Sequence, residues 1–396
     1  MTICNIPRIK IGNLEVNFIQ GGMGVGVSQA GLASAVANSG GLGVIASVGL
    51  GALNKPEGSD KTYFLEELGR RIKKIDTIIS DAEKKAEMDR CYALANQIAL
   101  RDEIKKTRKK TNGLVGTNIM HALTDYSSLV EAAISENVDV IISGAGVPRD
   151  LPKYLKNNPG KKTKLIPIVS DARLAEMICK SWTRNYEYAP DAIIVEGPMA
   201  GGHLGYSLSQ LENPEFVTKG LANIVKEVNI IVQPYRTISK TIPIIAAGGI
   251  FYGGDILSAL SWGASGVQMA TRFVTTHECD ASSAFKQAFI DCKKEDLRII
   301  KSPVGMPGRA ITGEFLERVI QGETTPINCP YHCLKPCIPE KSPYCIGKAL
   351  TNAYRGIISQ GFVFAGSNAW RCSEIMSVHD LVEKLDYEAG KGIICQ

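Results

Sequence analysis

Short apolar runs that end at glycine, asparagine or serine recur along the chain and alternate with longer stretches of mixed polarity. Runs such as DVIIS, DAIIVE and IPIIAA are apolar at nearly every position, which is typical of parallel strands covered on both faces. We count eight such runs: Val16–Gln20, Leu42–Ala46, Leu114–Asn118, Val138–Ser143, Leu165–Ser170, Ala192–Glu196, Ile242–Ala246 and Gly266–Met269. Their alternation with helical segments predicts an α/β fold of repeated βα units, and the number eight favours a closed (β/α)8 TIM barrel over a doubly wound sheet.

Two segments exceed what such a barrel needs. Residues 49–112, between the second and third strands, begin with a Gly/Pro turn and continue as a charged stretch with apolar residues at helical spacing, so we expect a helical insertion. The other segment follows residue 325 and holds clustered cysteines, then two helix-like stretches, Ile346–Ser359 and Val378–Ala389, joined by GFVFAGSNAW. We therefore predict a barrel over residues 1–325, insertion included, and a Cys-rich, helical C-terminal extension over residues 326–396.

Composition and charge narrow the class of protein. The 396 residues include 45 Lys+Arg and 40 Asp+Glu, and the basic residues are spread along the chain. No basic cluster therefore indicates nucleic-acid binding. The first residues lack the basic start and the apolar core expected of a signal peptide, and no run approaches the roughly 20 apolar residues of a membrane span. We expect a cytoplasmic protein whose partner is a small-molecule substrate rather than a nucleic acid or a membrane. Whether the protein forms a homodimer is left open by the sequence. In that compartment the 11 cysteines do not indicate a disulfide framework.

Glycines follow the last two predicted strands, where a barrel of this kind commonly binds a phosphate group. In AAGGIFYGG, Gly248 and Gly249 would let the backbone approach an anion, and in QMATRF, Ala270 and Thr271 offer two amides and a hydroxyl. Two tight turns without a ligand are the alternative. Their occurrence together on neighbouring strands favours a phosphate site.

The ends of the earlier strands offer polar atoms of a different kind. The first strand ends in QGGMG, the third in Asn118 and the fourth in SGAG, all suited to a flat heteroaromatic ring. The GMGVG after the first strand is not a dinucleotide fingerprint, because no acidic residue ends the following strand. This distribution predicts a nucleotide-type cofactor with its phosphate at strands seven and eight and its ring over strands one to four.

The sixth strand leads into EGPMAGGHLG, which contains one of the five histidines of the chain. His203 stands in a Gly-flanked loop at a strand end, where no bulky neighbour in the sequence shields it. Because histidine changes its charge near neutral pH, His203 is the best candidate for a general acid or base. The alternative is a structural or merely exposed histidine.

QGGMG, EGPMAGGHLG, AAGGI and QMATRF together resemble the motifs of the nitronate monooxygenase (2-nitropropane dioxygenase) family of FMN-dependent TIM barrels, which the FMN-dependent enoyl-ACP reductases share. The resemblance spans about residues 6–313. It implies a catalytic role for His203 and FMN as the cofactor. The implied FMN contacts are Gly248, Gly249, Ala270 and Thr271 at the phosphate, Gly21, Gly22, Met23 and Asn118 near the ring, and Glu196, Gly201 and Gly202 elsewhere.

This chain departs from the family pattern in three places. Pro198, Met199 and Ala200 stand where family members usually carry Glu-Ala before Gly-Gly-His. Ala270 replaces the usual glycine of the last phosphate loop, which an amide contact tolerates. The long insertion and the Cys-rich tail are expected to lie outside the common pattern.

Four of the cysteines are clustered in NCPYHCLKPCIPEKSPYC: Cys329, Cys333, Cys337 and Cys345. Four thiolates this close suit a tetrahedral zinc ion or an iron–sulfur cluster. Prolines would stiffen a loop that wraps a metal, so we favour a 4Fe–4S cluster. Zinc, with His332 in place of one thiolate, and free thiols in a surface loop remain open.

The resemblance implies an FMN-dependent oxidoreductase, for which three hypotheses compete. The first is a nitronate monooxygenase-like enzyme that oxidises a nitronate or similar small anion through flavin, with His203 handling the substrate proton. The second is a flavin reductase of enoyl thioesters with NAD(P)H as co-substrate. The third is a non-catalytic electron-transfer module that holds flavin and an iron–sulfur centre.

Overall fold

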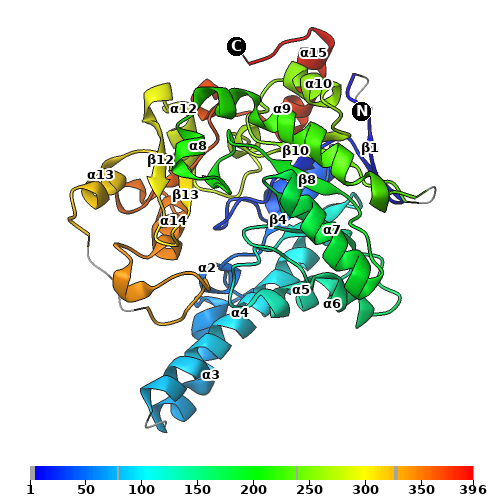
Figure 1. Ribbon diagram of the computed structural model, residues 1–396. Helices are drawn as coiled ribbons and strands as arrows, with labels where there is room; N and C mark the ends of the chain where they lie inside the picture. The colour runs from blue at the N-terminus through cyan, green and yellow to red at the C-terminus, as the bar shows by residue number, and fades with distance from the viewer. Residues whose placement is uncertain (1–4, 78–79, 238–239, 325–328, 396) are drawn as a thin grey trace.

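A closed barrel of eight parallel strands forms the centre of the computed structural model, which describes residues 5–77, 80–237, 240–324 and 329–395 (Figure 1). Neighbouring strands follow the order β3-β11-β10-β8-β7-β6-β5-β4, and a bridge between Ile19 and Leu42 closes the ring. The strands are β3 (Ile19–Gln20), β4 (Gly43–Ala46), β5 (Val115–Asn118), β6 (Val140–Ser143), β7 (Lys164–Val169), β8 (Ile193–Glu196), β10 (Ile244–Ala247) and β11 (Gly266–Met269). The predicted TIM barrel is confirmed.

Successive residues of each strand face opposite sides, as a strand period of two requires. Ile142, Ile194 and Ile245 belong to the cluster inside the barrel, whereas their neighbours pack outward against the helices. An antiparallel hairpin of β1 (Ile9–Ile11) and β2 (Leu14–Val16) joins the inner cluster through its own buried apolar side chains. The hairpin plugs the N-terminal end of the barrel, so the C-terminal strand ends are the open face.

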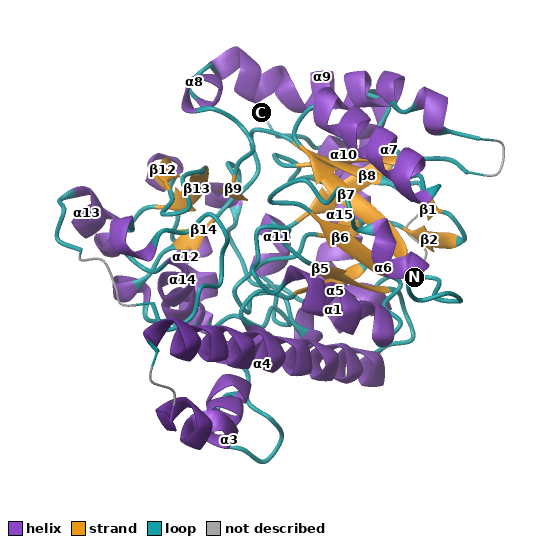
Figure 2. Ribbon diagram, turned by 60° about the horizontal axis from the view of Figure 1, so that its bottom comes forward, coloured by secondary structure: helices purple, strands orange, loops and turns teal. Residues whose placement is uncertain are grey.

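Helices surround the barrel, and the predicted insertion supplies one of them (Figure 2). α4 lies against α1 and α5, in the place of the helix that follows the second strand, while α3 projects from it (Figure 1). None of the described helices is long and apolar enough to cross a membrane. The ring consists of α1 (Ala30–Asn38), α4 (Asp81–Lys110), α5 (Tyr126–Ser135), α6 (Pro152–Lys156), α7 (Ala172–Tyr186), α9 (Pro214–Ile231), α10 (Gly253–Ser261) and α15 (Val378–Gly390), and the insertion adds α2 (Leu50–Leu53) and α3 (Tyr63–Thr77).

The last helix of the ring, α15, comes from the far C-terminal part of the chain and packs against both α10 and α1. The approach of α10 is so close that a Cβ on Gly253 would lie 1.9 Å from the Leu385 carbonyl oxygen. The Gly253 amide donates to the Glu388 carboxylate at 3.0 Å, and the Gly254 amide donates to the Ile393 carbonyl at 2.9 Å. The second glycine pair of AAGGIFYGG therefore serves helix packing. The division of the chain at residue 325 stays a prediction, with α15 lying beyond it in the barrel ring.

A small antiparallel sheet lies beside the barrel (Figure 2). Its strand β13 (Pro307–Ile311) pairs with β12 (Leu297–Lys301), β14 (Val363–Phe364) and β9 (Gly202–His203), so it joins the loop after the sixth barrel strand to the C-terminal part of the chain. The remaining helices are α8 (Leu208–Leu211), α11 (Thr271–Val274), α12 (Ser283–Ile290), α13 (Glu314–Ile320) and α14 (Ile346–Tyr354), with 3-10 turns at Gln233–Tyr235, Lys294–Asp296, Pro339–Lys341, Ile358–Gln360 and Ala369–Arg371.

Candidate functional site

The predicted cofactor residues all lie at the open face, because each follows or ends a barrel strand. The space around two glycines shows how closely the loops after the first, third and eighth strands approach one another. A Cβ on Gly22 would stand 2.3 Å from the Asn118 Cβ, and a Cβ on Gly21 would stand 3.2 Å from the Ala270 Cβ. Any larger residue at Gly22 would displace Asn118. The structure thus gathers residues that are up to 250 positions apart in the sequence.

The loop after β10 packs directly on the loop after β8. Gly248 and Gly249 have φ angles of +93° and +83°, a conformation that favours glycine. A Cβ on Gly248 would lie 2.9 Å from the Ala200 backbone nitrogen, and one on Gly249 would lie 3.0 Å from the Met199 side chain. Without side chains, the two residues leave their backbone accessible at the point where the resemblance places the phosphate.

His203 is held by residues from two distant segments. Its Nε2 lies 2.7 Å from Ser302 Oγ, and its ring packs edge-on against Phe364, with 5.1 Å between ring centroids. Strand β9 fixes the backbone by pairing His203 with Gly308. The expectation of an unshielded histidine was wrong, because Ser302 and Phe364 reach the loop only through the fold. Burial lowers the pKa of His203 to about 4, so the imidazole is neutral at pH 7.

Arg309 also holds the loop that carries His203, although no sequence motif marks this residue. Its guanidinium donates to the carbonyl oxygens of Pro198 at 2.8 Å and Ala200 at 2.6 Å, and the residue is 7% exposed. Burial lowers the pKa of Arg309 to about 10. These bonds hold residues 198–200 (Pro-Met-Ala) in place, the segment in which the chain departs from the family pattern.

Several polar groups at the open face have no protein partner, which is the pattern a polar ligand would resolve. Gln268 Oε1 and Ser367 Oγ are buried and have no hydrogen-bond partner among the described residues. Gln268 stands on β11, where its side chain approaches Gly21. Burial raises the pKa of Glu196, at the end of β8, to about 7. An unsatisfied amide oxygen and an unsatisfied hydroxyl beside glycine loops fit FMN, which carries a phosphate, a hydroxylated chain and a polar ring.

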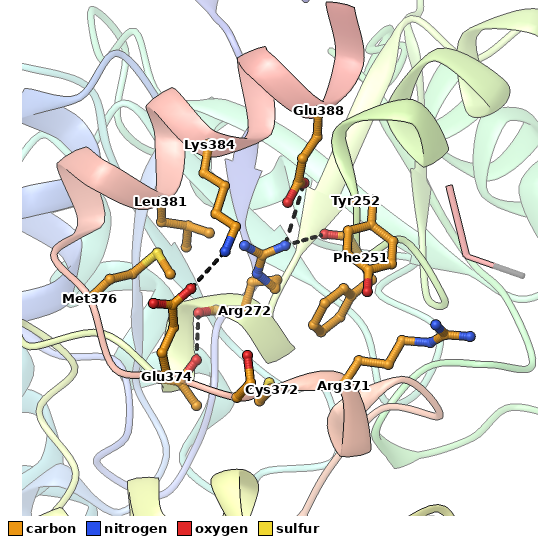
Figure 3. Close-up of a pocket in the computed structure, with 12 residues that line it drawn as sticks. Phe251, Tyr252, Arg272, Arg371, Cys372, Glu374, Met376, Leu381, Lys384 and Glu388 are labelled. Atoms are coloured by element: carbon orange, nitrogen blue, oxygen red, sulfur yellow. Dashed lines mark hydrogen bonds and ion pairs between the residues drawn. The ribbon is translucent and has the colours of Figure 1, made fainter. Parts of the chain in front are cut away.

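A cavity of about 110 Å³, lined by Phe251, Tyr252 and Arg272 among others, lies beyond the predicted phosphate loops and is separate from them (Figure 3). Figure 3 shows Arg272 pointing between Phe251 and Glu388, and Lys384 pointing at Glu374. Arg272 donates to the Phe251 carbonyl at 3.1 Å and lies 3.5 Å from the Glu388 carboxylate, while Lys384 pairs with Glu374 at 2.6 Å. Arg272 and Lys384 are therefore both paired, and the Arg272–Glu388 contact connects α11 to α15.

The structure does not assemble the predicted metal centre. Within the described ranges, no three His, Cys, Asp or Glu side chains are placed to hold a metal ion. The thiols of Cys329, Cys333, Cys337 and Cys345 are close enough for their charges to add to the burial that raises the pKa of Cys333 to about 12. Each of the other three has a partner of its own: Cys329 donates to the Tyr331 carbonyl, Cys337 lies near Ser342, and Cys345 accepts from the Lys348 amide.

Aromatic packing, rather than metal, orders the Cys-rich loop. Tyr331 stacks on Tyr92 of α4 with 4.1 Å between ring centroids, and Leu334 forms a bridge with Leu123. The loop buries its own apolar residues against the barrel helices, so its order does not require a metal. His332 also has other partners: its amide donates to Asp89, and its Nε2 lies 2.8 Å from the Cys337 carbonyl.

Fold and site together define a TIM-barrel oxidoreductase. The family model described as "Nitronate monooxygenase" matches residues 7–388, and the chain belongs to this family, which implies a flavin, FMN. The match includes most of the Cys-rich tail, so the expectation that the tail lies outside the common pattern was wrong. The physical reason is that α15, within that tail, completes the ring of barrel helices.

Individual relatives are distant. A probable nitronate monooxygenase of Staphylococcus aureus (strain MRSA252) is 26% identical over 311 residues, which are 78% of this chain and 79% of that protein. The structure of FabK from Thermotoga maritima aligns with a TM-score of 0.68 and 25% identity over 97% of this chain and 95% of that one. Nitroalkane oxidase from Streptomyces ansochromogenes, at a TM-score of 0.65, 21% identity and coverage of 95% and 96%, shows the same fold.

Proposed function

We propose that this protein is an FMN-dependent oxidoreductase of the nitronate monooxygenase type, which oxidises a nitronate or a similar small anion. The observation that carries the proposal is a neutral His203 set in the same open face as the glycine loops and the unpartnered polar groups. FMN, when bound, would supply the transfer of electrons from the substrate to O2. Gly248, Gly249, Ala270 and Thr271 would hold its phosphate.

The remaining predicted contacts divide between the ring and the rest of the cofactor. Gly21, Gly22, Met23 and Asn118 would lie near the ring, with Gly22 and Asn118 in contact with each other. Glu196, Gly201 and Gly202, which end or follow β8, would contact other parts of the cofactor. Because the pKa of Glu196 is about 7, its carboxyl is partly protonated at neutral pH and would donate a hydrogen bond to the ligand as well as accept one.

His203 would handle the substrate proton at Nδ1, because Ser302 occupies Nε2. A neutral imidazole suits an anionic substrate, since it donates or accepts a hydrogen bond without first losing a proton. An anion beside the ring raises the pKa of the imidazole, so proton uptake becomes easier once the substrate is present. Ser302 and Phe364 keep the ring in one orientation for this exchange.

The test begins with purified protein, which should be yellow with one FMN per chain. Anaerobic mixing with a small alkyl nitronate should bleach the flavin, and readmitted O2 should restore it. NADPH should bleach it far more slowly. Protein that binds FMN but is reduced by neither compound would indicate the electron-transfer module, and protein that binds no FMN would refute the proposal.

A second function is supported by the similarity to FabK over nearly the whole length of both chains. In an NAD(P)H-dependent reductase of enoyl thioesters, His203 would donate a hydrogen bond to the thioester carbonyl. Rapid anaerobic bleaching by NADPH, followed by reoxidation with an enoyl thioester, would favour this function. The iron–sulfur prediction has no support in the arrangement of the thiols and forms no part of either function.

A further inference from the structure

The C-terminal segment Ala365–Asn368 lies among the loops that would hold FMN. A Cβ on Gly201 would lie 2.6 Å from the Gly366 nitrogen, and a Cβ on Gly366 would lie 2.8 Å from Thr271 Oγ1. The Gly366 backbone is therefore seated between the loop after the sixth strand and the loop after the eighth. This segment is the AGSN part of the glycine-rich link noted in the sequence.

Hydrogen bonds hold the segment in this place. The Ser367 amide donates to the Met199 carbonyl at 3.1 Å, and the Asn368 side-chain amide donates to the Gly249 carbonyl at 2.7 Å. Strand β14, immediately before the segment, pairs with β13. The position of the segment is thus determined by contacts with the loops after the sixth and seventh strands and with the small sheet.

The Ser367 hydroxyl is the group that these contacts leave unused. Ser367 Oγ is buried and has no hydrogen-bond partner among the described residues. A buried hydroxyl without a partner destabilises a protein by about 1–3 kcal/mol, and the segment that carries this hydroxyl is bonded to the loops of Met199 and Gly249. Such an atom beside an anion site is satisfied when it donates to a phosphate oxygen.

We propose that Ser367 donates a hydrogen bond to the FMN phosphate, so that the C-terminal extension completes the cofactor site. The inference rests on the proposed function, because it requires that FMN binds at the open face. It assigns to the extension a binding role that the predicted contacts at Gly248, Gly249, Ala270 and Thr271 do not include. Asn368 acts as a positioning residue, since it holds Gly249 rather than the ligand.

Flavin affinity measured on apoprotein tests the assignment without any turnover. FMN and riboflavin, which differ only in the phosphate, are titrated separately, and quenching of flavin fluorescence gives each Kd. Ser367→Ala should weaken FMN binding about 10- to 100-fold, the range expected for one hydrogen bond to a charged group, and should leave riboflavin binding within threefold. Ser373→Ala, at an exposed serine six positions later, is the matched control and should leave both Kd values unchanged.

The outcomes separate the inference from the proposed function. An equal loss of FMN and riboflavin affinity would place the hydroxyl at the ring or the ribityl chain and overturn the phosphate assignment, as would a change below threefold for both. Wild-type protein that binds neither flavin would instead overturn the proposed function. A circular dichroism spectrum that matches the wild type excludes misfolding, and Ser367→Thr, which keeps the hydroxyl, should retain most of the FMN affinity.

Discussion

Replacing Arg309 tests whether its two hydrogen bonds stabilise the loop that carries His203. Arg309→Met removes the donors to Pro198 and Ala200 and keeps an apolar stem of similar length. Two hydrogen bonds from a charged group stabilise by about 3–6 kcal/mol. Burial opposes this, because it lowers the pKa of the guanidinium from 12.5 to about 10, and at about 1.4 kcal/mol per pKa unit the charged form is disfavoured by roughly 3 kcal/mol.

The difference between these two effects predicts that Arg309→Met lowers the free energy of unfolding by up to about 3 kcal/mol. Arg309→Lys should be at least as harmful, because the shorter lysine keeps a buried charge but does not reach the position of Nη1, the single nitrogen that donates both bonds. Urea unfolding of the apoprotein at pH 7, followed by circular dichroism, measures both. Arg298→Met, at an exposed position of the adjacent strand β12, is the control and should change stability by less than about 0.5 kcal/mol. A lysine variant as stable as wild type would refute the reasoning, since a charge alone would then suffice.

Three further predictions concern the open face. His203→Asn should keep FMN while turnover falls about 10²- to 10⁴-fold, and because the pKa of His203 is about 4, the wild-type kcat/KM should show no protonation of this residue between pH 6 and 8. Glu196→Gln should flatten the dependence of stability on pH. The pKa of Glu196 in the folded protein, about 7, lies above the ordinary value of 4.5, so the stability of the wild type falls as the pH rises from 4.5 to 7. At pH 8 the variant should therefore be about 1–3 kcal/mol more stable than the wild type in thermal or urea unfolding. Gly249→Ala should reduce FMN affinity and destabilise the fold by about 1–3 kcal/mol, because its φ is +83° and its Cβ would lie 3.0 Å from Met199; unchanged flavin binding would contradict this.

The sequence contained enough information for the barrel, because apolar runs of four to six residues specify buried parallel strands locally. Only the first strand was misplaced: Val16 belongs to the β1–β2 hairpin, and β3 begins at Ile19. The convergence of the predicted cofactor loops at one face was also predictable, since each directly follows a strand and the strand ends of a barrel converge.

The residues that pack on the loop of His203 were not predictable from the sequence. Ser302, Arg309 and Phe364 reach the His203 loop from 99 or more positions away and carry no motif that marks them. Their contacts depend on the pairing of β13 with β9 and β14, which local polarity does not specify. The metal centre predicted at the four cysteines has no support for a related reason. The spacing of the cysteines does not reveal that Tyr331 stacks on Tyr92 of α4.

The position of α15 has a consequence for how the protein is made. The Asn5 amide donates to the Asp386 carboxylate at 2.8 Å, so residues 381 positions apart meet beside the ring that α15 closes. During synthesis, the barrel strands through β11 emerge more than 100 residues before the helix that covers the gap between α10 and α1. Closure therefore depends on contacts of very long sequence separation, which form slowly and leave apolar strands exposed in the meantime. A nascent chain of this protein would need protection from aggregation until residue 390 has left the ribosome.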